Sequence, residues 1–284
     1  MRTYQGSIIT KTPITPSGPY QCSTASGVWT IDQMVGWQKA GLWPTAGNSF
    51  VGAIAIFALG LAPCASTTRN KYTFSNCLNG SATAASTASF RGSAAGNATV
   101  GIFALGFAPC ASTTRNKYTY SGDVNASATA SSAASTAGSA AGNSIVGIFA
   151  LGNNSTTRNK YTYSGCVNAS ATASSAGSYG GSAAGNSTVG IFAIGNSITT
   201  RNKYTYSGDT NGSATSATTG NSYGSAAGNA TVGIFQLGSG TSGAISCRNK
   251  YTYSGCVNSS GTAASANPTA GNVGFSVAIS GVNA

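Results

Sequence analysis

The strongest constraint on this chain is an internal repeat. The pentapeptide Arg-Asn-Lys-Tyr-Thr occurs five times, with its arginines 46, 43, 43 and 47 residues apart. A second element, Gly-Asn followed by an apolar run that contains glycine, occurs six times. A period in the forties is typical of arrays in which each copy is one supersecondary unit and must stack on its neighbours to bury its apolar face.

Each copy reads as four short strands, and the second copy shows them best. Ser-Ala-Ala-Gly is followed by a Gly-Asn pair that suits the positive φ of a tight hairpin. The apolar run 100–106 has the length of a strand. In 115–122 the side chains alternate, with Arg115 and Lys117 on one face and Asn116 and Tyr118 on the other. A turn and a second small-residue strand complete the copy, which has the size of one propeller blade.

We therefore expect an all-β fold, a six-bladed β-propeller of about 45-residue repeats. Small residues in the first strand fit the crowded axis, and the phenylalanine of each apolar run is expected to pack between blades. Because the apolar half occurs six times and the Arg-Asn-Lys-Tyr-Thr half five times, strands from 6–12 and 27–31 are expected to complete the sixth blade. Residues 1–46 would then supply the closing strands and a short helix, and 47–284 the repeats. A β-solenoid with two rungs per repeat is the alternative.

The segment Thr30–Trp43 differs from the repeats. Thr30 is a candidate N-cap, apolar residues follow at helical spacing, and Gly41 would end the helix. Trp37 and Trp43 lie in this segment, and Trp29 directly precedes it. The segment is expected to be a short helix that either lies on the propeller or docks to a larger particle through these tryptophans.

The composition argues against catalysis. The chain has three acidic residues, no Glu and no His, so a Ser-His-Asp or Cys-His site is impossible. The seven cysteines show no metal-ligand spacing, and three of them alternate with Asp at one repeat position. We therefore expect no enzyme, no cofactor and no metal, with thiols that are free in a reducing cytosol. Membrane insertion is not expected either, because the longest apolar run is too short and is broken by Gly and Pro.

The basic residues are the main candidate for a binding site. Ten of the fourteen lie in the repeats and would form a ring of Arg–Lys pairs with too few acids to neutralise it. One interpretation is structural: Arg caps carbonyls of the adjacent blade, and Lys is solvated. The other is a basic ring that meets an anionic surface such as lipopolysaccharide or an acidic protein. The ring comprises Arg69, Lys71, Arg115, Lys117, Arg158, Lys160, Arg201, Lys203, Arg248 and Lys250.

The blade pattern resembles kelch-type repeats, although the double glycine after the second strand is reduced to one and the later Trp is absent. The wording of 96–106 (GNATVGIFALG) and 113–123 (TTRNKYTYSGD) is similar to kelch-like propeller repeats in virion proteins of tailed phages. The stretch 25–44 also resembles a segment of phage tail and particle proteins. The resemblance implies a structural virion protein, made in the host cytoplasm and placed in the tail or fibre region. A capsid decoration protein and a carbohydrate-binding, lectin-like propeller are the alternatives. The partners it implies are other virion proteins and a host surface glycan; nucleic acid is not expected.

Overall fold

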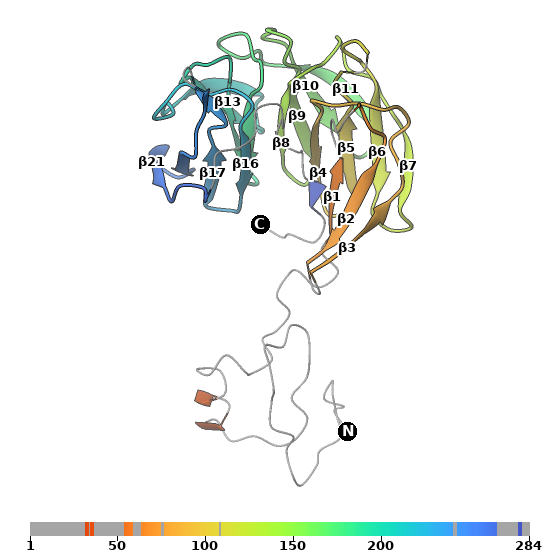
Figure 1. The fold of residues 1–284 in the computed structure, drawn as a ribbon, viewed down its shortest axis with the longest axis horizontal. Coiled ribbons are helices and arrows are strands. Elements are labelled where there is room, and N and C mark those ends of the chain that lie inside the picture. Colours follow the sequence, from red (N-terminus) through yellow and green to blue (C-terminus); the bar gives the residue numbers. More distant parts are fainter. Residues whose placement is uncertain are drawn as a thin grey trace.

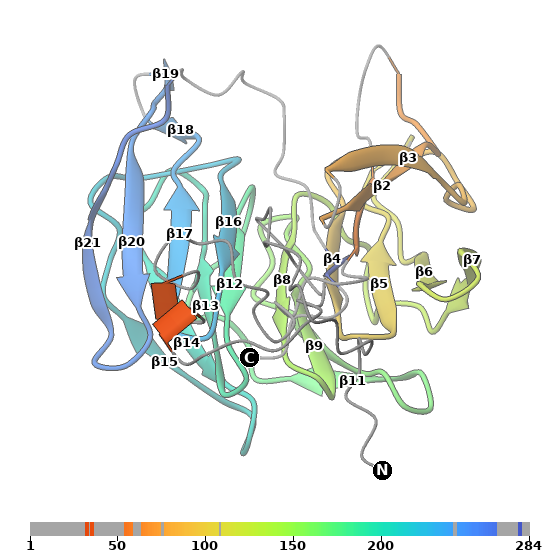
Figure 2. The same ribbon diagram turned by 90° about the horizontal axis from the view of Figure 1, so that it is seen from below.

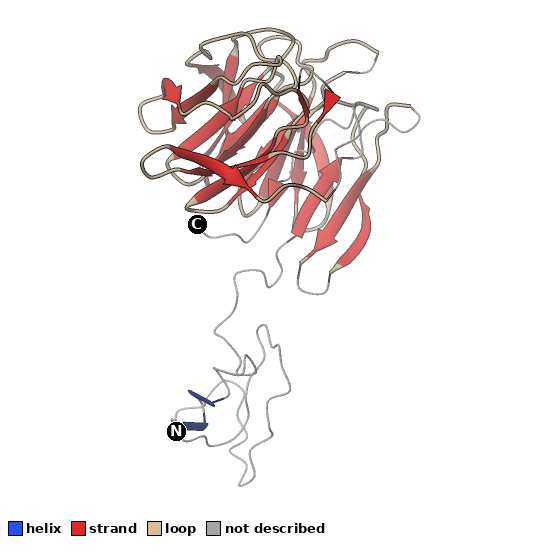
Figure 3. Cartoon of the chain, turned by 60° about the vertical axis from the view of Figure 1, so that its left-hand side comes forward, coloured by secondary structure: helices blue, strands red, loops and turns tan. Residues whose placement is uncertain are grey.

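Five four-stranded antiparallel sheets surround a common axis and form a β-propeller (Figure 1, Figure 2). The structure is a computed structural model that describes residues 32–33, 35–36, 54–58, 64–74, 77–107, 109–240, 243–265 and 278–279. Figure 3 shows that strands dominate the described chain and that loops join them at the two ends of the sheets. The expected all-β propeller of four-stranded blades is confirmed, and the β-solenoid alternative is wrong.

All five sheets run from an inner strand at the axis to an outer strand at the rim. Blade one contains β22 (Ala278–Ile279), β1 (Ile54–Ala58), β2 (Arg69–Thr73) and β3 (Leu78–Ala82). Blade two contains β4 (Ser93–Gly96), β5 (Val100–Ala104), β6 (Arg115–Thr119) and β7 (Val124–Ala128). Blade three contains β8 (Ser139–Gly142), β9 (Val146–Ala150), β10 (Arg158–Thr162) and β11 (Val167–Ala171). Blade four contains β12 (Ser182–Gly185), β13 (Val189–Ala193), β14 (Arg201–Thr205) and β15 (Thr210–Ala214). Blade five contains β16 (Ser225–Gly228), β17 (Val232–Gln236), β20 (Arg248–Thr252) and β21 (Val257–Gly261), with a ribbon of β18 (Ser239–Gly240) and β19 (Gly243–Ala244) between β17 and β20.

The inner strands consist of small residues because the neighbouring backbone and a tyrosine approach them closely. A Cβ added to Gly96 would lie 2.5 Å from the carbonyl oxygen of Val100 and 2.9 Å from the hydroxyl of Tyr120. The hairpin that follows differs from the expected one, since neither Gly96 nor Asn97 has a positive φ. Instead the Asn97 side-chain oxygen accepts hydrogen bonds from the backbone N–H of Thr99 (2.9 Å) and of Val100 (3.0 Å). The side chain therefore closes this turn locally.

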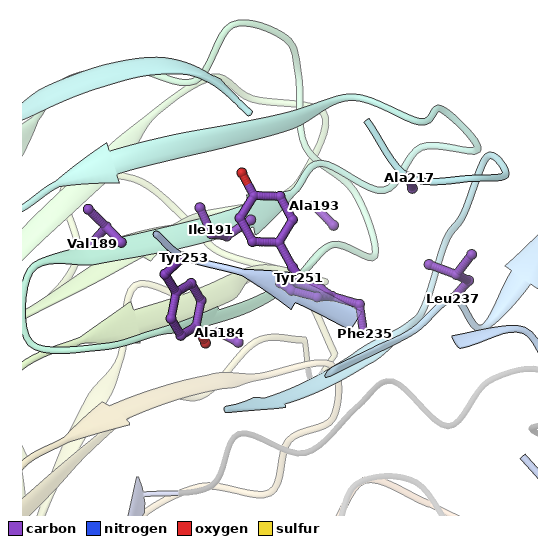
Figure 4. Close-up of a cluster of buried hydrophobic side chains, with 9 residues drawn as sticks. All are labelled: Ala184, Val189, Ile191, Ala193, Ala217, Phe235, Leu237, Tyr251 and Tyr253. Carbon is purple, nitrogen blue, oxygen red and sulfur yellow. The ribbon is translucent and has the colours of Figure 1, made fainter. Parts of the chain in front are cut away.

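The core is divided into clusters that lie between neighbouring blades. One cluster combines Ile191 of blade four with Phe235 and Tyr251 of blade five, all fully buried (Figure 4). The other junctions repeat this arrangement with Phe103, Phe149 and Phe192. The prediction that these phenylalanines pack between blades is thus confirmed, and burying each such ring contributes about 1.5–3 kcal/mol.

The blade count is five, so the expected count of six is wrong. The first apolar copy forms β1, the second strand of blade one. Part of the last copy forms β22, which takes the inner place of the same sheet and pairs antiparallel with β1. The first and last copies thus share one blade, which is why six apolar halves and five Arg-Asn-Lys-Tyr-Thr halves make five sheets. The N-terminal closing strands predicted at 6–12 and 27–31 lie outside the described residues.

The predicted N-terminal helix is not established. Of the segment Thr30–Trp43, only residues 32, 33, 35 and 36 are described, and they define no helical element. Trp29, Trp37 and Trp43 lie outside the described residues, so their docking role stays a prediction. No helix in the described part of the chain is long and apolar enough to cross a membrane.

Candidate functional site

Four of the five repeated arginines lie between blades and not on a common surface. Arg115 of blade two donates hydrogen bonds to two asparagine side chains of blade three, from Nη1 to Asn168 Oδ1 (2.6 Å) and from Nη2 to Asn159 Oδ1 (3.1 Å). Its guanidinium also lies over the Phe149 ring, 4.6 Å from the centroid. Arg69, Arg158 and Arg201 make the same contacts to the next blade.

Burial makes these four arginines structural. Each is at most 1% exposed, and burial lowers the pKa of each guanidinium to about 10, which leaves it charged at neutral pH. The acceptors are asparagine side chains, where the structural interpretation expected backbone carbonyls. An asparagine oxygen accepts a hydrogen bond from the buried guanidinium without adding a second buried charge. The arginines of blades one to four are therefore not available to an external ligand.

The lysines lie nearer to solvent, and three of them pair with the turn residue of the next blade. Lys71 Nζ is 3.1 Å from Asp123 Oδ2, and Lys117 Nζ is 3.4 Å from Cys166 Sγ. Asp123 and Cys166 both have a φ near +55°, at the turn between the third and fourth strands. The alternation of Asp and Cys along the sequence thus occurs at one turn position that faces a lysine. Lys71 and Asp123 are each about one-third exposed, so such a pair contributes only about 0.2–1 kcal/mol.

Two further contacts join neighbouring blades, an asparagine contact at three junctions and a threonine contact at four. The side-chain N–H of Asn97 donates to the carbonyl oxygen of Ser144 in the next blade at 3.0 Å, and Asn143 and Asn186 repeat this bond. Near the turn between the third and fourth strands, the Thr83 hydroxyl donates to the carbonyl oxygen of Asp123, and equivalent threonines follow. All of these side-chain contacts point in one direction, from a blade to its successor.

A series of three backbone hydrogen bonds links the residues that precede the inner strands of blades two to five. The N–H of Ala137 donates to the carbonyl of Arg91, that of Gly180 to Ala137, and that of Tyr223 to Gly180, at 2.9, 2.9 and 2.6 Å. All four residues have a φ between +52° and +62°. Glycine takes such a conformation freely, whereas arginine and tyrosine rarely do.

Next to these hydrogen bonds lies a cluster that the sequence did not predict, the axial cluster of Phe90, Arg91, Tyr179 and Tyr223. The Arg91 guanidinium donates from Nη1 to the Tyr179 hydroxyl (2.9 Å) and lies 5.4 Å from the centroids of Phe90 and Tyr223. All four side chains are partly exposed. The signal was present in the sequence, because these residues occupy two adjacent repeat positions that are Thr or Ser, and Ala or Gly, in the other described copies.

The last pair of the predicted ring differs from the others. Arg248 of blade five is partly exposed, and its Nε donates to Gln236 Oε1 of its own blade at 2.9 Å. Lys250 is exposed, whereas the other four repeat lysines are partly buried. The structure thus separates the basic ring into four buried arginines, a row of lysines near solvent, and one arginine that, within the described part of the chain, bonds only to its own blade.

The chain matches no profile of a known protein family, and no curated protein matches it. What defines the class of protein is therefore the fold, a repeat β-propeller with directional polar contacts between blades. Within the described residues, no three His, Cys, Asp or Glu side chains lie together as a metal site would require.

Proposed function

We propose that this chain is a structural protein of a tailed-phage virion, a propeller mounted on the particle in the tail or fibre region. The proposal rests on the resemblance of the repeat and of 25–44 to phage particle proteins. The observation that supports a structural role is the use of the repeated charged side chains. The four buried arginines and their asparagine acceptors hold one blade against the next, whereas a repeated catalytic site would direct its polar groups at a substrate.

The test is assembly. Purified particles from an infected culture are separated on a density gradient, and the chain is detected in the particle band with a specific antibody. We expect it to sediment with intact particles and antibody label to lie on the tail in electron micrographs. Label over the head would favour the capsid decoration alternative. A chain that stays at the top of the gradient would contradict a virion role.

Carbohydrate binding is the second candidate, and the axial cluster is the observation that favours it. Aromatic faces beside a partly exposed guanidinium, which forms no ion pair among the described residues, suit a sugar ring bearing hydroxyl or carboxylate groups. The cluster lies where the inner strands begin, at the end of the propeller that also carries the loops between the second and third strands. Titration with purified lipopolysaccharide should saturate for the unchanged protein and weaken at least tenfold in Arg91→Ala. Equal binding by both proteins would exclude the axial cluster as the glycan site.

A further inference from the structure

Four junctions between blades are complete, and their pattern defines two complementary surfaces. The donor half of a blade consists of the arginine, lysine and threonine that face its successor, as Arg69, Lys71 and Thr83 do in blade one. The acceptor half consists of a phenylalanine, two asparagines and the turn residue that face the preceding blade. In blade two these are Phe103, Asn116, Asn125 and Asp123.

Blade five carries a donor half without an acceptor, and blade one carries an acceptor half without a donor. The donor half of blade five is Arg248, Lys250 and Thr262, and the acceptor half of blade one is Phe57, Asn70, Asn79 and Cys77. Among the described residues, no hydrogen bond joins these two blades. Figure 2 shows blades one and five at the two ends of the arc of sheets.

The exposure of both surfaces is abnormal for this fold. Ile234 of blade five is 37% exposed, whereas the equivalent Ile102, Ile148 and Ile191 are fully buried against the next blade. On the other side, Phe57 is partly exposed, whereas Phe103, its counterpart in blade two, is 2% exposed. Each surface is thus an uncovered apolar and polar face whose partner is known from four other junctions.

We propose that the donor half of blade five docks on the acceptor half of blade one of the same chain and closes the ring through a fifth junction. Arg248 then donates to Asn70 and Asn79 and lies over Phe57, and Lys250 faces Cys77. The Nη groups of Arg248 are suited to this because Gln236 engages only Nε.

The covalent path favours the chain's own blade one over a second copy. After β21 ends at Gly261, the chain returns to blade one and forms β22 beside β1. Sixteen residues, 262–277, span this step, compared with the ten residues, 129–138, that connect β7 to β8 across one junction. The two surfaces are therefore joined by a short covalent path, and joining two binding surfaces in one chain gives an effective concentration of up to about millimolar. A head-to-tail contact between separate copies would have to compete with that concentration and would also grow into open filaments unless it closed.

Thiol cross-linking tests the contact directly, because Cys77 provides one reactive group. Lys250→Cys places a second thiol opposite it in the proposed junction, and Lys117→Cys opposite Cys166 is the matched control in a junction that the structure contains. Both variants are treated at low protein concentration with a short bismaleimide, and cross-linked peptides are identified by mass spectrometry. We expect a 77–250 link within a monomer, at a yield within about twofold of the control link. A 77–250 link found only in dimers, or no such link where the control link forms, would overturn the proposal.

A comparison of melting temperatures tests, independently of the cross-linker, whether the fifth junction forms. Asn168→Ala removes an acceptor of Arg115 and lowers the melting temperature. Asn79 occupies the equivalent position in blade one and is exposed, so Asn79→Ala would be silent in an open arc. In the closed ring, Asn79→Ala lowers the melting temperature by about as much as Asn168→Ala does. A melting temperature of Asn79→Ala equal to that of the unchanged protein would refute closure.

Discussion

Replacing Arg158 by methionine tests whether the buried arginines hold the blades together. Methionine keeps most of the unbranched stem and its packing but removes the guanidinium. The loss includes the hydrogen bonds to Asn211 (2.7 Å) and Asn202 (3.1 Å) and the contact with the Phe192 ring at 4.6 Å.

The expected change in the free energy of unfolding is the difference between lost contacts and a relieved burial cost. Two hydrogen bonds to a charged group contribute about 3–6 kcal/mol together, and the ring contact adds about 1 kcal/mol. Removing the charge relieves its burial cost, which the lowering of the Arg158 pKa to about 10 puts at about 3 kcal/mol. The net expectation is a loss of about 1–4 kcal/mol in the free energy of unfolding. For a body of this size that lowers the melting temperature by about 2–4 °C per kcal/mol.

The assay is thermal and urea unfolding followed by circular dichroism, at neutral pH and in high salt. Lys160→Met is the matched control, because Lys160 pairs with Asp209 at 3.4 Å near the surface and its loss should cost less than about 1 kcal/mol. The effect of Arg158→Met should persist in salt because the site is buried. The reasoning is refuted if Arg158→Met unfolds like the unchanged protein, or if both variants lose the same stability.

Further predictions concern the axis, alkaline pH and the lysines. Gly190→Ala should destabilise by about 1–3 kcal/mol in urea unfolding, because its Cβ would lie 2.8 Å from the Tyr206 hydroxyl and 3.1 Å from Ala141 Cβ, whereas Gly212→Ala, with open space around it, should be neutral. Burial raises the pKa of Tyr206 and of six other tyrosines, which stay protonated in the folded state but ionise near pH 10 when unfolded. The free energy of unfolding should therefore stay constant below about pH 10 and fall above it. The four buried arginines partly oppose this fall, because their pKa is lowered on folding. Tyr206→Phe should reduce the fall by about 1.4 kcal/mol per pH unit in urea titrations. Replacing the five repeat lysines by Gln should leave melting nearly unchanged; if the lysines bind an anionic partner, attachment measured at rising salt should weaken and lose salt dependence.

The repeat was sufficient to predict the blade and its internal order. The alternation of Arg115, Asn116, Lys117 and Tyr118 correctly indicated two faces of one strand, and the structure shows what each face does. Arg115 and Lys117 contact the following blade, whereas Asn116 and Tyr118 receive the preceding one. The pairing of Arg with Asn was not predictable from one copy, because the partners are 44 or more residues apart and belong to different copies.

The sequence predicted neither the shared first blade nor the axial cluster, for two different reasons. Counting half-copies could not reveal that the first and last share one sheet, since the pairing of Ala55 with Ile279 joins strands from the two extremes of the repeat array. The axial cluster depends on Arg91 reaching Tyr179 across the axis, from blade two to blade four. Periodicity within a blade carries no information on which side chains meet across the axis. A position-by-position comparison of the copies would have shown where symmetry is broken, although not which of those residues come into contact.

The directional junction has a consequence for how such a chain can evolve. Since each described blade offers a donor half on one side and an acceptor half on the other, any copy is compatible with any neighbour. An in-frame duplication or deletion of one 43-residue copy would create no mismatched interface. Recombination between near-identical copies therefore offers a direct route to propellers of different size, limited mainly by whether β22 still reaches β1. Variation that changes what the protein contacts is expected to accumulate in the loops, where it leaves the junctions intact.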